Sequence, residues 1–137
     1  SHISRISAVN NRAPKITLDV DVVPSGLELF VDPEQIEQVL INLLRNAEQA
    51  LAGRKDGSIT LRAFLNPRGQ VTLEVRDNGP GIDEKILHQI FVPYFTTKPE
   101  GSGIGLALAR QIVMTHGGSI RADNVPDGGA VFTLTFV

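Results

Sequence analysis

Residues 32–53 read DPEQIEQVLINLLRNAEQALAG, a stretch that contains the start, the apolar stripe and the end of one long helix. Asp32 is a side-chain N-cap, Pro33 suits the first helical position, and Gln35 is able to reach back to the cap. Gly53 is placed to stop the helix. Apolar residues recur at three-to-four spacing, as on the buried face of a helix: Ile36, Val39, Leu40, Leu43, Leu44, Ala47, Ala50 and Leu51. The pattern predicts a core helix that runs to about Ala52.

Asn42 and Asn46 lie four residues apart at the border of that stripe, and therefore on one face of the helix. Asparagine lowers helix propensity by roughly a few tenths of a kcal/mol relative to alanine, because its side chain competes for backbone hydrogen bonds. From the sequence, the two asparagines are explained about equally well by a polar border of the helix and by a binding role. An amide oxygen is a suitable ligand for Mg²⁺, which binds few protein groups and keeps waters and substrate phosphates.

Strand patterns lie on both sides of this helix, with period-two alternation or runs of β-forming residues. Six strands are expected: 15–22, 27–31, 58–65, 70–76, 119–123 and 130–137. Turn residues 66–69 join two of them in a hairpin, a short helix is expected near 83–88, and a second long helix from about 103 to 116. The fold class is therefore α/β, a two-layer sandwich with a mixed, mostly antiparallel sheet covered on one face by helices.

Bulk properties limit the class of protein. A chain of 137 residues with 42% hydrophobic residues is expected to form one domain. Thirteen Lys and Arg against 15 Asp and Glu give no basic field, so nucleic acid is not an expected partner. With no cysteine there is no disulfide framework and no thiolate nucleophile. Apolar stretches are too short for a membrane span, and no membrane contact is expected of these residues.

Two glycine-rich segments lie in the second half of the chain. Residues 77–81 read DNGPG directly after a strand, and residues 101–105 read GSGIG at the start of the second long helix. Each segment alone is compatible with an ordinary turn. Glycines at alternate positions nevertheless let backbone amides approach a ligand, and a helix N-terminus favours anions. Neither segment matches the Walker phosphate loop or the complete dinucleotide-binding fingerprint.

Four segments in order resemble the sequence boxes of the histidine-kinase ATP-binding domain. Residues 42–47 are similar to its asparagine box, 77–81 to its first glycine box, 90–98 to its phenylalanine box, and 101–106 to its second glycine box. The resemblance covers about 15–137 and is strongest to nitrogen-regulatory sensor kinases. It implies a Bergerat-type fold, ATP and Mg²⁺ as ligands, and residues 1–14 as a tail or linker end from a missing helical domain.

The resemblance also implies roles for individual residues. Asp77, as an ionised carboxylate, would accept a hydrogen bond from the adenine amino group, Asn46 would ligate Mg²⁺, and Asn42 would help to hold the phosphate side. Lys98 would contact phosphate, and Asn42, Asn46 and Lys98 form the expected catalytic set. The remaining nucleotide-binding residues, with a lid between 96 and 102, are expected to be Gly79, Gly81, Ile82, Thr96, Thr97, Gly101, Ser102, Gly103, Ile104, Gly105 and Leu106.

Two positions depart from the wider superfamily. Gyrase-type and chaperone ATPases have a water-activating Glu where this chain has Asn42, and a neutral amide cannot serve as that base. The chain is therefore expected to favour phosphoryl transfer over hydrolysis. Some relatives have Thr at the position of Ala130, where it touches the adenine pocket through water, so that contact is in doubt here.

The whole-protein function that the resemblance implies is a two-component sensor histidine kinase. Its γ-phosphate acceptor would be a histidine on a separate dimerisation domain, with a response regulator downstream. An anti-sigma-type serine kinase and a non-catalytic ATP-sensing module remain open as alternatives. The fragment is expected to be cytoplasmic. The resemblance is also compatible with a longer parent protein that is anchored in the inner membrane.

Several other residues are assigned structural roles. His88 and His116 lack the surroundings of a phosphoacceptor, and a cation near a helix C-terminus accounts for His116. An exposed helix position accounts for Arg45. Three aromatic residues are expected to pack as apolar anchors under the lid: Phe91, Tyr94 and Phe95.

Overall fold

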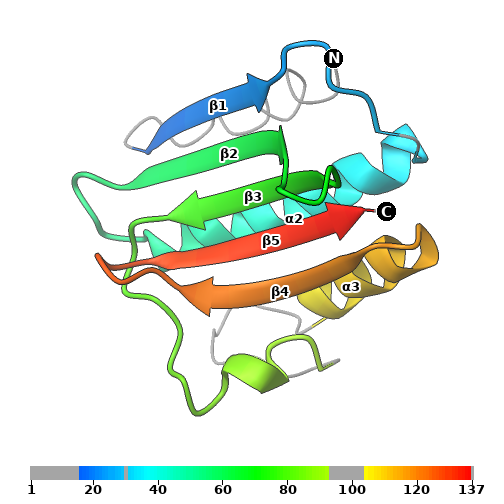
Figure 1. The fold of residues 1–137 in the computed structure, drawn as a ribbon. Coiled ribbons are helices and arrows are strands. Elements are labelled where there is room, and N and C mark those ends of the chain that lie inside the picture. Colours follow the sequence, from blue (N-terminus) through cyan, green and yellow to red (C-terminus); the bar gives the residue numbers. More distant parts are fainter. Residues whose placement is uncertain (1–15, 30, 93–103, 137) are drawn as a thin grey trace.

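The computed structural model describes residues 16–29, 31–92 and 104–136. These residues form one five-stranded sheet in the order β1-β2-β3-β5-β4, with two long helices on one of its faces (Figure 1). The elements are β1 Thr17–Val23, α2 Pro33–Ala50, β2 Ser58–Leu65, β3 Val71–Asp77, the 3-10 helix η1 Leu87–Gln89, α3 Gly105–Thr115, β4 Ser119–Asn124 and β5 Ala130–Phe136. The expected two-layer α/β sandwich is confirmed.

The sheet is mixed, as the sequence predicts. β1 lies parallel to β2, in a register that places Thr17 opposite Ser58. The pairs β2–β3, β3–β5 and β4–β5 are all antiparallel. A parallel neighbour requires a crossover, and α2 supplies it between β1 and β2. The helix with which the sequence analysis begins therefore also fixes the topology of the sheet.

The start of α2 has the expected N-cap. The Oδ1 atom of Asp32 accepts hydrogen bonds from the backbone N–H groups of Glu34 and Gln35, at 3.0 and 3.3 Å. The expected reach of Gln35 back to the cap has a competitor, because the Asp32 N–H donates to Nε2 of His116 at 3.3 Å. α2 ends at Ala50, with Leu51 as its C-cap and Gly53 at a φ of +82°.

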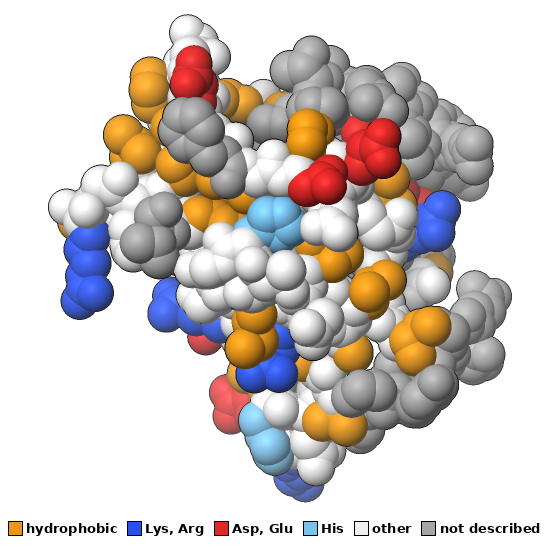
Figure 2. All heavy atoms as spheres, turned by 90° about the vertical axis from the view of Figure 1, so that its right-hand side faces the viewer, with side chains coloured by type: hydrophobic (Ala, Val, Ile, Leu, Met, Phe, Trp, Pro, Cys, Tyr) orange, Lys and Arg blue, Asp and Glu red, His pale blue; other side chains and the backbone are white. Residues whose placement is uncertain are grey.

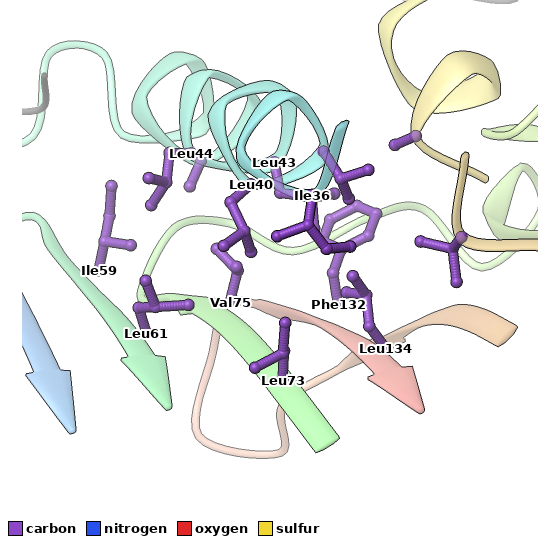
Figure 3. Close-up of a cluster of buried hydrophobic side chains, with 14 of the residues drawn as sticks. Ile36, Leu40, Leu43, Leu44, Ile59, Leu61, Leu73, Val75, Phe132 and Leu134 are labelled. Atoms are coloured by element: carbon purple, nitrogen blue, oxygen red, sulfur yellow. The ribbon is translucent and has the colours of Figure 1, made fainter. Parts of the chain in front are cut away.

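The apolar stripe of α2 packs on the inner face of the sheet. Leu40 and Leu43 point from the helix toward Val75 of β3 and Phe132 of β5 (Figure 3). Truncating one such leucine to alanine costs about 2–5 kcal/mol. Seven of the eight predicted stripe residues are buried, and the exception, half-buried Ala50, lies beside Gly79. The helix is thus held rigidly over the sheet, with its polar border left for other contacts.

Two predicted elements are wrong. Residues 27–29 and 31 form no strand, although Leu27, Leu29 and Val31 pack against the core. Their alternation reflects apolar contacts of a connection from the sheet edge to α2, without backbone pairing. The short helix expected at 83–88 is a series of turns that becomes helical only in η1, because each bond spans three residues, as from Ile86 N–H to Asp83 O.

One end of the molecule collects the ends of several elements. β3, β4 and α2 all end there, and β5 begins there, at the left of Figure 1. The opposite end, which faces the viewer in Figure 2, presents acidic, basic and hydrophobic side chains in small groups. There the His116 ring joins α3 to α2.

Candidate functional site

One face of α2 connects the two glycine-rich segments. The Nδ2 of Asn42 donates to the backbone oxygen of Gly105, the first residue of α3, at 3.1 Å. Two helical turns later Ala50 lies against Gly79, where an added Cβ would stand 3.1 Å from the Ala50 oxygen. Asn46 is four residues from each, so it lies on the same face between them. At 1.5 Å per residue this face spans roughly 12 Å.

Asn42 is engaged at both ends of its amide. Its Oδ1 accepts from Nε2 of Gln38 at 3.0 Å, while its Nδ2 donates to Gly105. A glutamate at this position has no donor for the Gly105 oxygen. The Asn42 side chain therefore ties α2 to the start of α3.

Asp77 ends β3 and faces the helices. Its exposed fraction is 4%, on the inward side that Leu73 and Val75 also occupy. The carboxylate Oδ1 accepts the backbone N–H of Gly79 at 2.8 Å. A Cβ at Gly79 would lie 2.9 Å from that oxygen and 3.1 Å from the backbone oxygen of Ala50, so a larger residue would crowd the turn. A buried carboxylate thus stands beside the last turn of α2.

Asn78 ties the segment that follows β3 to β2. Its Oδ1 accepts the N–H of Ser58 at 2.8 Å, and its Nδ2 donates to the oxygen of Asp56 at 2.9 Å. The backbone oxygen of Asn78 in turn accepts a hydrogen bond from the Arg54 side chain. These contacts hold the residue next to Asp77 against the loop between α2 and β2.

Sequence reasoning missed the turn between β4 and β5, which forms the other wall of this segment. Gly129 has a φ of +104°, and a Cβ there would lie only 1.9 Å from the backbone oxygen of Asp77. Asn124, the last residue of β4, binds the backbone of Ile82. The adjacent glycines 128 and 129 were an available signal for a special turn, whereas nothing in the sequence marks Asn124.

The second glycine-rich segment is described only in part. Gly105 begins α3, Ile104 before it is exposed, and Leu106 packs partly against the core. The other predicted phosphate and lid residues lie outside the described residues: Thr96, Thr97, Lys98, Gly101, Ser102 and Gly103. Tyr94, Phe95 and the predicted tail 1–14 lie outside them as well.

Phe91 has the packing role that the sequence predicts. Its ring meets the ring of Phe132 edge to face, with centroids 6.1 Å apart and an interplanar angle of 89°. Arg45 is exposed on α2, and His88 is exposed in η1. Phe91 therefore anchors the end of the described 31–92 segment to the sheet.

His116 has a structural role, as the sequence predicts, through both of its ring nitrogens. Its Nδ1 lies 2.8 Å from the oxygen of Ile112, and its Nε2 faces the Asp32 N–H. His116 joins the end of α3 to the cap of α2.

The metal ligand that the sequence predicts is Asn46. Among the described residues no group of three or more His, Cys, Asp or Glu side chains could hold a metal ion. Asn46 offers an amide oxygen on the α2 face, a ligand type that Mg²⁺ accepts alongside waters and phosphates. The residues fit a magnesium ion that arrives with a phosphate ligand.

Comparison with known proteins assigns the family. Residues 31–137 match the model for histidine kinase-, DNA gyrase B- and HSP90-like ATPases. The chain belongs to this family. The predicted resemblance of the chain to histidine-kinase-type ATP-binding domains is thereby confirmed, and the predicted Bergerat-type layout agrees with it.

Relatives of this ATPase domain are sensor kinases. The chain is 36% identical over 134 residues to the sensor histidine kinase ZraS of Klebsiella oxytoca. The aligned region covers 98% of the chain and 29% of that protein. It is 35% identical over 136 residues to the sensory histidine kinase/phosphatase NtrB of Rhizobium leguminosarum bv. phaseoli, covering 90% of the chain and 35% of that protein. The predicted likeness to nitrogen-regulatory kinases is confirmed.

Solved structures agree. The catalytic domain of histidine kinase ThkA superposes with a TM-score of 0.84 at 32% identity, covering 98% of the chain and 89% of that domain. In a complex of ThkA with the response regulator protein TrrA, the TM-score is 0.80 at 30% identity, over 98% of the chain and 39% of ThkA. The ATPase domain thus spans about a third or less of the length of the two sensor kinases above. In the described residues no helix has the length and apolarity to cross a membrane.

Proposed function

We propose that this ATPase domain binds Mg-ATP along the α2 face and delivers the γ-phosphate to a histidine of a separate dimerisation domain. One observation carries the proposal. A single helix face bridges Gly79, next to buried Asp77, and Gly105, at the start of α3, with Asn46 between them. The adenine base would then lie at the Asp77 end of this helix face, and the phosphates at the Gly105 end.

At the base end, Asp77 would accept the adenine amino group while Gly79 and Gly81 let the backbone pass close to the ring. Ile82, packed against the core, would border the base. Because Oδ1 of Asp77 already accepts from Gly79, the carboxylate is held in one orientation. Such a fixed acceptor distinguishes adenine, which has a donor there, from guanine, which has a carbonyl.

At the phosphate end, backbone amides near Gly103, Gly105 and Leu106 would receive the β- and γ-phosphates at the N-terminus of α3. Asn46 would hold Mg²⁺, which neutralises phosphate charge when bound. The other contacts proposed from the sequence are those of Thr96, Thr97, Lys98, Gly101, Ser102 and Ile104. Asn42 would keep α3 in register with α2.

In the reaction, an imidazole nitrogen of the acceptor forms a bond to the γ-phosphorus as the bond to the β–γ bridging oxygen breaks, and ADP leaves. Catalysis of this kind depends on positioning and charge neutralisation. Because the amide of Asn42 cannot take a proton from water, hydrolysis is disfavoured. A cytoplasmic location and a response regulator as the next phosphate acceptor complete the proposal, supported by the sensor kinases among the relatives.

The first test is calorimetric titration of the 137-residue chain with ATP and Mg²⁺. Asp77→Asn should lower ATP affinity by about a hundredfold, since a charged acceptor of a buried hydrogen bond contributes on the order of 2–3 kcal/mol. Asp83→Asn is the matched control, because exposed Asp83 also accepts an N–H two residues on, from Lys85 at 3.0 Å. Unchanged binding by Asp77→Asn would rule out the pocket.

The metal and the acceptor need separate measurements. Asn46→Ala should remove most of the gain in affinity that Mg²⁺ gives, and an undiminished gain would exclude Asn46 as a ligand. The full-length parent protein, given ATP labelled at the γ-phosphate, should acquire an acid-labile, alkali-stable label, as a phosphorylated imidazole does. An acid-stable label would indicate a serine acceptor, and no label an ATP-sensing module.

A further inference from the structure

The side chain of Asn124 forms two hydrogen bonds with the backbone of the segment after β3, as a neighbouring strand would. Its Nδ2 donates to the backbone oxygen of Ile82 at 2.7 Å, and its Oδ1 accepts the backbone N–H of the same residue at 2.7 Å. The side-chain amide of Asn124 therefore satisfies both the backbone N–H and the backbone carbonyl of Ile82, 42 positions away in the sequence. The contact is half-buried, where unpaired backbone groups are costly.

The backbone at Gly81 packs closely against this contact. Gly81 has a φ of +83°, and a Cβ there would lie 2.8 Å from Oδ1 of Asn124 and 3.3 Å from the oxygen of Gly129. Glycine at 81 is therefore required by the amide that holds its neighbour. The Asn124 side chain and the Gly129 backbone together fix where residues 81 and 82 run.

Asparagine alone among residues of this size meets the demand. Aspartate has the same shape but no donor for the Ile82 oxygen, and serine is too short to bond both backbone groups at once. Gly79, whose N–H donates to the Asp77 carboxylate, lies three positions before Ile82. Displacing Ile82 would therefore loosen the turn that aims that carboxylate.

We infer that Asn124 is a positioning residue that sets base selectivity: it holds the Gly81–Ile82 backbone so that Asp77 and its turn face adenine in one orientation. The inference rests on the proposed function, since it presupposes that the base binds beside Asp77. It adds a residue from β4, outside all four sequence boxes.

The test compares ATP and GTP affinity by calorimetry for the 137-residue chain and three variants. Asn124→Ala should lower ATP affinity about tenfold, as expected when two hydrogen bonds that hold a binding loop are lost. Weak GTP binding should change much less, so the ATP-to-GTP ratio falls. Asn124→Asp, which keeps the shape, should shift the ratio in the same direction.

Asn66→Ala is the matched control. Asn66 also bonds backbone groups, accepting from the N–H of Arg68 at 3.0 Å and of Gln70 at 2.9 Å, but in the distant β2–β3 turn. This variant should lower the melting temperature and leave the ATP-to-GTP ratio unchanged, so general loosening is separated from positioning.

The outcomes are distinct. If the parent chain binds no ATP, the proposed function fails. If the parent discriminates ATP from GTP and both Asn124 variants retain the full ratio, the inference is overturned and the nucleotide site stands. Should Asn124→Ala fail to fold, Asn124→Asp decides; if neither folds, Asn124 is a folding residue and the inference is likewise overturned.

Discussion

Two turns at opposite ends of the sheet both depend on asparagine side chains, but in different ways. In the β2–β3 turn, Asn66 bonds Arg68 and Gln70, two and four residues away. At the other end, Asn78 reaches back 20 residues to Ser58, and Asn124 reaches back 42 residues to Ile82. The first turn is complete within itself, while the second is assembled from three parts of the chain.

The difference matters for function. A turn that satisfies its own hydrogen bonds needs nothing from the rest of the fold. The segment 77–82 has few internal bonds of this kind, and other elements determine its shape. Such a segment can present backbone and a buried carboxylate to a ligand, because its walls are supplied from outside.

The largest expected effect comes from glycines with positive φ at the two ends. Gly129→Ala should destabilise the domain by about 3 kcal/mol or more, because left-handed strain adds to a clash with the Asp77 oxygen. Gly69→Ala, at a φ of +76° with nothing within 4 Å, should cost only the strain, about 1 kcal/mol. Thermal and urea unfolding would measure both. Equal losses would mean that the close approach at Gly129 relaxes without cost.

A middle-sized effect is expected for Asn78→Ala. The side chain loses its bonds to Ser58 and Asp56, which together contribute about 1–2 kcal/mol. ATP affinity should fall with stability, because Asp77 is the neighbouring residue, and urea denaturation and calorimetry on one preparation would measure both. Asn66→Ala should show the stability loss alone. An Asn78 variant with normal ATP binding would separate this clamp from the site.

The smallest effect concerns the two ends of α2. Burial raises the pKa of Glu48 above its ordinary 4.5, and the charge of Arg45 opposes the rise. The folded chain therefore keeps the Glu48 proton to higher pH than the unfolded chain, so stability is lost as pH rises from 4.5 through the raised pKa. Glu48→Gln should raise the melting temperature slightly at pH 7, and this gain should vanish well below pH 4.5.

Glu34→Gln provides the opposite sign at the start of α2. A negative charge in the first turn favours the helix, so its removal should lower the melting temperature at pH 7, by the equivalent of about 0.3–1 kcal/mol. Melting curves of both variants across pH would test the contrast. Shifts of the same sign would contradict either the burial effect at Glu48 or the helix-dipole effect at Glu34.

The sequence predicted much of the fold because its signals are local. The N-cap of Asp32, the α2 stripe and the β2–β3 hairpin are all readable within a few residues. The strand expected at 27–31 failed because an alternating apolar pattern records which residues touch the core, and a connection can do that as well as a strand. Pairing depends on a neighbouring strand, which periodicity does not reveal.

The site was predictable to the extent that its residues lie in recognisable boxes. Asn42 contacts Gly105 at the start of α3, and Gly79 contacts Asp77 and Ala50 near the end of α2. The role of Asn42 was only half visible, because its bond to the Gly105 oxygen joins residues 63 positions apart. Asn124 and Gly129 were invisible as site residues for the same reason.

By itself the sequence determined the helix over the core, the strands that carry it, and the kinds of chemical group available for a nucleotide. Only the tertiary structure decided which backbone each amide would hold and how closely two strand ends could approach. The physical reason is range: helix caps, periodicity and turns act over a few residues. Hydrogen bonds such as that of Asn124 exist only after β5 has paired with both β3 and β4, which brings the end of β4 to the segment that follows β3.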